Sequence, residues 1–225
     1  EFLHQYRIAI RRSRAIAESV QDVTGDNSLA KGVKTLRRHA RATGPLRDLH
    51  VFLQDLPELC ADDAEIRAAL QIWFEREAAS HHKKLAKRLK SKRYQDSLEH
   101  WRNLIDSRKF QKSAATLRQK DIRRAVERRI KEFNKRTAEL MHTSPDEDIH
   151  RLRKQLKRIR YLMELDAKTW KRNLKILKER QELYGRFQDL HVQILLLDQF
   201  RQAAPEVLPA ALNGIVETLE DHKAN

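Results

Sequence analysis

The sequence contains little glycine and proline, with five of each among 225 residues. Both residues are the usual material of tight turns, so their scarcity makes sandwiches, barrels and hairpin-rich folds poor candidates. The glycine-rich phosphate loops GxGxxG and GxxxxGK[ST] do not occur. A single cysteine, Cys60, excludes a disulfide within the chain and fits a reducing cytoplasm.

Signals for membrane insertion, metal binding and catalysis are also missing. No apolar run approaches the roughly 20 residues that span a bilayer. No two of the ten histidines are three or four residues apart, the spacing that places two metal ligands on one helix face. The GxSxG, HExxH and cysteine–histidine signatures are absent. We therefore expect a protein that is not an enzyme, holds no metal or cofactor and does not insert into a membrane.

Apolar residues recur at helical spacing along almost the whole chain, and no segment alternates with a period of two. This pattern predicts an all-α fold. It predicts one long helix over about 113–141, and Gly185 is expected to end another helix, because glycine commonly follows the last helical residue. One apolar stripe that must face a core consists of Leu152, Leu156, Ile159 and Met163.

The positive charge is concentrated in a few short segments. The chain has 47 Lys and Arg residues against 32 Asp and Glu residues, a net charge of +15. Four segments hold 21 of the basic residues and no acidic residue: 4–14, 34–41, 81–93 and 150–160. A solvated helix usually mixes the two signs, because like charges one turn apart repel each other. The clustering therefore indicates a polyanionic partner.

Two sequence patterns recur in the same order. The pattern HxxRxx[IL][RK]RxR appears at 4–14 and again at 150–160, and GxxxDLHV appears at 44–51 and again at 185–192. The recurrence predicts an internal duplication within a single 1–225 domain. The copies would cover about 1–90 and 142–225, with intervening helices over about 91–141. We expect two pseudo-symmetric helical bundles around a basic central groove or pore.

Helical geometry places the basic residues of each repeated pattern on one face of a helix. At about 100° per residue, His4, Arg7, Arg11 and Arg14 share a helix face, and His150, Arg153, Lys157 and Arg160 share another. Each basic row would lie beside an apolar stripe and so beside a packing seam. The candidate anion-binding residues are His4, Arg7, Arg11, Arg12, Arg14, Arg37, Arg41, Lys84, Arg88, His150, Arg153, Lys154, Lys157, Arg158 and Arg160.

These repeated motifs, together with the KRIRYLMEL segment at 157–165, resemble the CHAD domain, the conserved histidine α-helical domain. The resemblance covers nearly the whole chain. It implies a helical fold with two pseudo-symmetric four-helix halves, and it implies a non-catalytic module that binds inorganic polyphosphate in a central basic pore. Such a ligand would associate the protein with polyphosphate granules in the cytoplasm.

Several roles stay open from the sequence. His4 and His150 could donate to phosphate or hydrogen-bond a neighbouring helix. Asp48 and Asp189 could orient a basic side chain from behind the ligand, or each could cap a helix locally.

The partner also has alternatives. A nucleic acid or an acidic protein would also match the charge, and other polyanions are candidate ligands. No helix-turn-helix, zinc-finger or RNP motif is present. Aromatic residues such as Trp101 and Tyr161 are expected in the core rather than in base-stacking positions.

Overall fold

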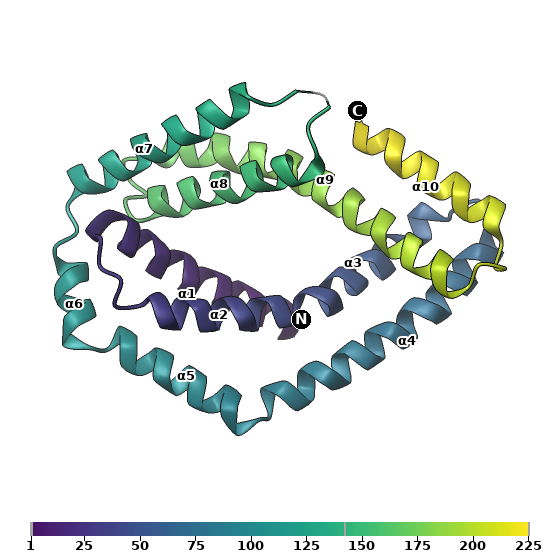
Figure 1. Ribbon diagram of the computed structural model, residues 1–225, viewed down its shortest axis with the longest axis horizontal. Coiled ribbons are helices and arrows are strands. Elements are labelled where there is room, and N and C mark those ends of the chain that lie inside the picture. Colours follow the sequence, from purple (N-terminus) through teal and green to yellow (C-terminus); the bar gives the residue numbers. More distant parts are fainter. Residues whose placement is uncertain (1, 142, 225) are drawn as a thin grey trace. The chain divides into compact units, whose positions relative to one another are not determined.

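The computed structural model describes residues 2–141 and 143–224, and every regular element within them is an α-helix (Figure 1). The prediction of an all-α fold is therefore confirmed. The helices are α1 (Phe2–Thr24), α2 (Ala30–Ala42), α3 (Gly44–Leu59), α4 (Ala64–Leu89), α5 (Lys92–Ile105), α6 (Arg108–Ala115), α7 (Gln119–Ala138), α8 (Asp146–Glu164), α9 (Lys171–Ala203) and α10 (Pro209–Ala224).

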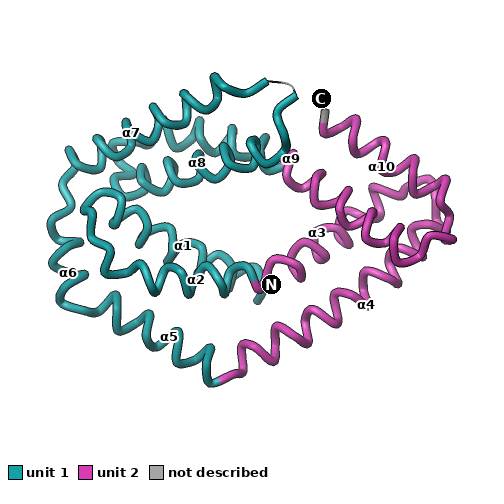
Figure 2. Tube along the Cα trace, in the orientation of Figure 1, with its two compact units in different colours: residues 1–41, 92–185 teal, residues 42–91, 186–225 magenta. Residues whose placement is uncertain are grey.

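The chain folds into two compact units (Figure 2). Unit 1 comprises residues 1–41 and 92–185, and unit 2 comprises residues 42–91 and 186–225. Each unit thus combines a segment of the first expected repeat copy with a segment of the second. The compact units do not follow the boundaries of the copies, and the duplication itself stays a prediction.

The core of unit 1 forms where α7 and α8 pack against each other. The expected apolar stripe of α8 is buried: Leu152, Leu156, Ile159 and Met163 are each no more than 2% exposed. They cluster with Val126 of α7 and Leu177 of α9. Burying a side chain of this size contributes about 1.5–3 kcal/mol, so this cluster fixes the direction in which α8 presents its polar residues.

Helix α2 follows α1 through a short turn. Gly25 has a φ of +74°, a conformation that side chains with a Cβ rarely adopt, and its N–H donates to the Gln21 carbonyl over 2.9 Å. The Asp26 carboxylate accepts a hydrogen bond from the Ser28 N–H at 2.8 Å. This bond is the main reason why the pKa of Asp26 is lowered. The turn therefore fixes where α2 begins.

A close approach holds α2 against α5. A Cβ atom on Gly32 would lie 2.6 Å from the Trp101 ring, so only glycine fits at this point. One helical turn from the C-terminus of α2, His39 Nε2 lies 2.8 Å from Ser97 Oγ of α5. These two contacts fix the face of α2 that carries Arg37 and Arg41.

Unit 2 has its own core. Phe52 of α3 and Phe74 of α4 have ring centroids 4.4 Å apart, and Phe74 also lies against Phe200 of α9. Asp63 caps α4, with its carboxylate accepting hydrogen bonds from the N–H groups of Glu65 and Ile66. Helix α4 carries the basic segment of unit 2 at its C-terminal end.

Two expected helix boundaries are wrong. The single helix expected over 113–141 is two helices, α6 and α7, because the Thr116 hydroxyl donates to the Ser113 carbonyl and competes with the helical bonds. Gly185 does not end a helix, since α9 continues through it without a positive φ. A glycine inside a helix costs only about 1 kcal/mol, which is too little to end a helix of 33 residues.

Candidate polyanion-binding site

Both repeated basic rows lie in unit 1, because α1 packs against α8. On α1, Arg7, Arg11 and Arg14 are half-buried, whereas His4 is exposed. On α8, the half-buried residues of the row are His150, Arg153, Lys157 and Arg160. Half-burial next to a packed core restricts the side chains, so the cationic groups are held beside the seam between two helices.

Lys154 of α8 is surrounded by like charges. Lys154 is exposed, but partial desolvation by the neighbouring helices lowers its pKa, and the positive charges of Arg41, Arg158, Arg151 and Arg153 lower it further. Arg41 comes from the C-terminal end of α2, so two helices of unit 1 contribute to this field. Cations gathered this closely repel one another, and a bound anion would relieve the repulsion.

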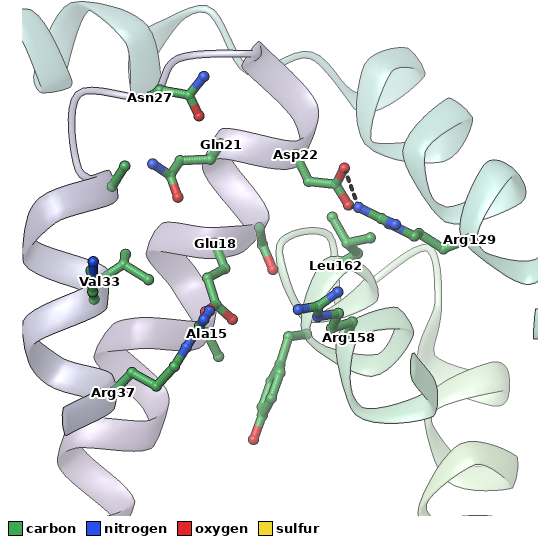
Figure 3. Close-up of a pocket in the computed structure, with 14 residues that line it drawn as sticks. Ala15, Glu18, Gln21, Asp22, Asn27, Val33, Arg37, Arg129, Arg158 and Leu162 are labelled. Atoms are coloured by element: carbon green, nitrogen blue, oxygen red, sulfur yellow. Dashed lines mark hydrogen bonds and ion pairs between the residues drawn. The ribbon is translucent and has the colours of Figure 1, made fainter. Parts of the chain in front are cut away.

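A pocket of about 510 Å³ opens between α1, α2, α7 and α8, all in unit 1 (Figure 3). Figure 3 shows Arg37 and Glu18 on one side of this pocket and Arg158 and Arg129 on the other. Lys34 also lines it. No carboxylate of the described residues forms an ion pair with Arg158. The pocket therefore presents guanidinium donors from separate helices to one volume.

Glu18 connects two of the candidate arginines. Its Oε1 atom lies 2.8 Å from Arg37 Nη2 on α2 and 3.7 Å from Arg14 Nε on α1. The Glu18 side chain is 24% exposed and lines the pocket together with Arg37, which is 44% exposed. The network holds Arg14 and Arg37 together in one charged group.

Asp22 occupies the other end of the pocket and pairs with α7. Its carboxylate accepts hydrogen bonds from Arg128 Nη2 at 2.7 Å and from Arg129 Nε and Nη2 at 2.8 and 2.9 Å. Hydrogen bonding to Asp22 is the main reason why the pKa of Arg129 is raised. The contact fixes α1 to α7 beside the pocket, which Asp22 and Arg129 both line.

The remaining candidates lie outside this cluster. Arg12 is exposed on α1, and Lys84 and Arg88 are exposed on α4 of unit 2. Asp48 in α3 and Asp189 in α9 also belong to unit 2. Neither is the residue that caps its helix, so the local-cap interpretation is wrong, and the orienting role stays a prediction, as do the roles of His4 and His150.

Some residues of the pocket were not predicted. Glu18 could have been found, because it is one helical turn from Arg14. The pair Asp22 and Arg129 is separated by 107 residues and has no local signal. Tyr161 was expected in the core, but it is half-buried, lines the pocket and carries the Arg160 guanidinium over its ring at 4.8 Å.

Comparison with known families identifies the fold. The family model of the CHAD domain matches residues 1–198. The chain belongs to the CHAD domain family. It is also similar to the crystal structure of the CHAD domain from the plant Ricinus communis, with 25% sequence identity and a TM-score of 0.76. That similarity covers 100% of this chain and 76% of the other.

Two further comparisons are negative. The search of curated proteins finds no match. Across residues 2–141 and 143–224, no helix is both long enough and apolar enough to cross a bilayer.

Proposed function

We propose that this CHAD domain binds inorganic polyphosphate, without catalysing a reaction on it, at the basic surface formed by α1, α2 and α8 in unit 1. The observation that carries the proposal is the gathering of cationic side chains from three helices of unit 1: half-buried Arg7 and Arg11 lie on α1, which packs against α8, and Arg37 of α2 and Arg158 of α8 line one pocket. The lowered pKa of Lys154, beside these groups, agrees with this crowding of positive charge. The family resemblance supports polyphosphate as the anion that these cations attract.

The chemistry of the side chains supports the same ligand class. Guanidinium groups form bidentate, charge-assisted hydrogen bonds to phosphate oxygens, and lysine adds a mobile point charge. Helices held by packed apolar faces present these groups as a fixed row. A linear chain of phosphates offers one negative charge after another to such a row, whereas a single phosphate engages few donors at once.

Competition between polyanions tests the proposal. Fluorescent long-chain polyphosphate would be displaced from the intact domain by unlabelled polyphosphate, duplex DNA or RNA at matched phosphate concentration and fixed ionic strength. We expect unlabelled polyphosphate to displace it at far lower concentration, because a stiff duplex cannot follow a pocket between helices. Equal displacement by nucleic acid would contradict the proposal and favour a nucleic-acid partner.

Arginines of α7 offer a matched control in the same unit. Arg123 and Arg124 are exposed and pair with acidic residues of their own helix, and neither lines the pocket. The variant Arg123→Gln/Arg124→Gln should bind polyphosphate like the wild type. The variant Lys154→Gln/Arg158→Gln, with the same loss of charge, should bind it more weakly. Equal loss in both variants would mean that net charge alone attracts the ligand.

We also propose that the ligand brings the protein to polyphosphate granules in the cytoplasm. The single cysteine fits a reducing compartment. A fluorescent fusion of the wild type should co-localise with stained granules, and a fusion of Lys154→Gln/Arg158→Gln should be diffuse. Granule localisation that the double substitution leaves unchanged would contradict this mode of recruitment.

A further inference from the structure

The pocket in unit 1 contains two carboxylates with different surroundings. The charge of Asp22 is met by Arg128 and Arg129 of α7, which are not among the candidate ligand-binding residues. The charge of Glu18 is met by Arg14 and Arg37, which are candidate ligand-binding residues. Asp22 therefore joins two helices, whereas Glu18 occupies donors that a phosphate would need.

The geometry places Glu18 in competition with an incoming anion. The contact from Glu18 Oε1 to Arg37 Nη2 is 2.8 Å, the length of a charge-assisted hydrogen bond. A guanidinium edge that binds this carboxylate cannot present the same N–H groups to phosphate. A phosphate that stayed beside the pair would face a like charge at close range.

We propose that Glu18 is an internal counter-ion that the polyanion displaces from Arg37 and Arg14, and that it thereby limits affinity for short phosphate chains. This inference rests on the proposed function. A long chain can contact the α8 cations while Glu18 keeps its arginines, so the carboxylate opposes it little. A short anion confined to the pocket must displace Glu18 to reach enough donors.

Substitution of Glu18 by glutamine tests the inference with tripolyphosphate as the probe. Calorimetric titration of Glu18→Gln should give an affinity at least fivefold higher than wild type for tripolyphosphate, and a smaller gain for long-chain polyphosphate. The matched control is Glu127→Gln, which removes one carboxylate that pairs with Arg123 at 3.0 Å on the exposed side of α7. That control reports the gain caused by net charge alone.

A double-mutant cycle isolates the contact with Arg37. If Glu18 acts by occupying Arg37, most of the gain from Glu18→Gln should vanish in an Arg37→Gln background. A gain that persists unchanged in that background would overturn the inference. Thermal melts of each variant establish that it is folded, and Glu18→Asp, which keeps the charge but withdraws it from Arg37, should show part of the gain.

The inference and the proposed function fail in different ways. If wild type binds polyphosphate and Glu18→Gln gains no more than Glu127→Gln for tripolyphosphate, the counter-ion role is wrong while the proposed function stands. If neither the wild type nor Glu18→Gln binds phosphate chains of any length, both are wrong.

Discussion

Helices α7 and α8 lie side by side in unit 1, and both are rich in arginine and lysine. They differ in how their basic side chains are paired with carboxylates. On α7, Arg123 pairs with Glu127, Arg124 with Asp121, and Arg129 with both Asp22 and Glu132. On α8, residues 150–160 contain no acidic residue. Two of the four carboxylates of that helix, Asp148 and Glu164, pair with Arg151 and Arg160 near its two ends.

The difference shows that the number of basic residues is a weaker indicator of an anion site than their pairing. Four arginines of α7, at 123, 124, 128 and 129, pair with carboxylates of the same unit, so they contribute to the fold and to solubility. The α8 cations crowd one another, as the lowered pKa of Lys154 records. Crowded cations destabilise the free protein and stabilise a complex with a polyanion.

The largest expected effect is a loss of polyphosphate affinity when two cations of α8 are neutralised, with no loss when two cations of α7 are neutralised. Hydrogen bonds to charged groups contribute about 1.5 kcal/mol each, which is roughly tenfold in affinity. Lys154→Gln/Arg158→Gln should therefore weaken polyphosphate binding by about 100-fold at low salt. Fluorescence anisotropy measures this loss, with Arg123→Gln/Arg124→Gln as the reference. A loss below threefold on α8 would remove the distinction between the two helices.

The next effect concerns the stability of the fold, to which the ion pairs between α1 and α7 contribute. Asp22 is 17% exposed and binds two arginines of α7, so Asp22→Asn should lower the free energy of unfolding by about 1–3 kcal/mol. Glu127→Gln breaks a pair whose side chains are 71% and 57% exposed, and the change should stay under about 0.5 kcal/mol. Urea denaturation compares the two variants. Equal stability would show that the Asp22 network does not hold α1 to α7.

The smallest effect is a proton taken up on binding. A bound phosphate favours the ammonium form of Lys154 and raises its lowered pKa again. At a pH above the lowered pKa, binding therefore takes up a fraction of one proton, and affinity falls as the pH rises through this window. Titration calorimetry in two buffers of different ionisation enthalpy detects the uptake. An uptake that persists in Lys154→Gln would show that another group is responsible.

The same pKa shift has a consequence for the free protein. Because the folded state disfavours charged Lys154, it binds this proton more weakly than the unfolded chain does. Its destabilising effect is fully present below the lowered pKa and is relieved as the pH rises toward the ordinary lysine value. Free wild type should therefore gain stability through this window relative to Lys154→Gln, as urea denaturation at several pH values would show.

The sequence predicted what local periodicity controls. The helical class and the buried stripe of α8 follow from residue spacing within one or two helical turns. The basic row of α8 follows from the same spacing. Its neighbour Arg41 was a candidate from its charged segment alone, and only the packing of α2 places it near Lys154.

The rest depends on contacts that spacing does not contain. Asp22 and Arg129 form an ion pair although 107 residues separate them in the sequence. Glu18 pairs with Arg37 of α2, a contact that its position in the sequence does not predict. Gly185 was expected to end a helix because glycine is common just after the last helical residue. The structure shows instead that α9 continues through it. The compact units interleave both expected repeat copies, which a linear division of the chain at about 90 and 142 does not anticipate.

The salt dependence of binding tests the central claim most directly, because it counts the cations that neutralise the ligand. The logarithm of the affinity of wild type for long-chain polyphosphate should fall linearly with the logarithm of salt concentration. For Lys154→Gln/Arg158→Gln the slope should be smaller by about 1.4, at about 0.7 for each charge on a single strand. For Arg123→Gln/Arg124→Gln it should be unchanged. Equal slopes in the two variants would contradict the account, because Lys154 and Arg158 of α8 would then contribute no more than Arg123 and Arg124 of α7, which pair with carboxylates.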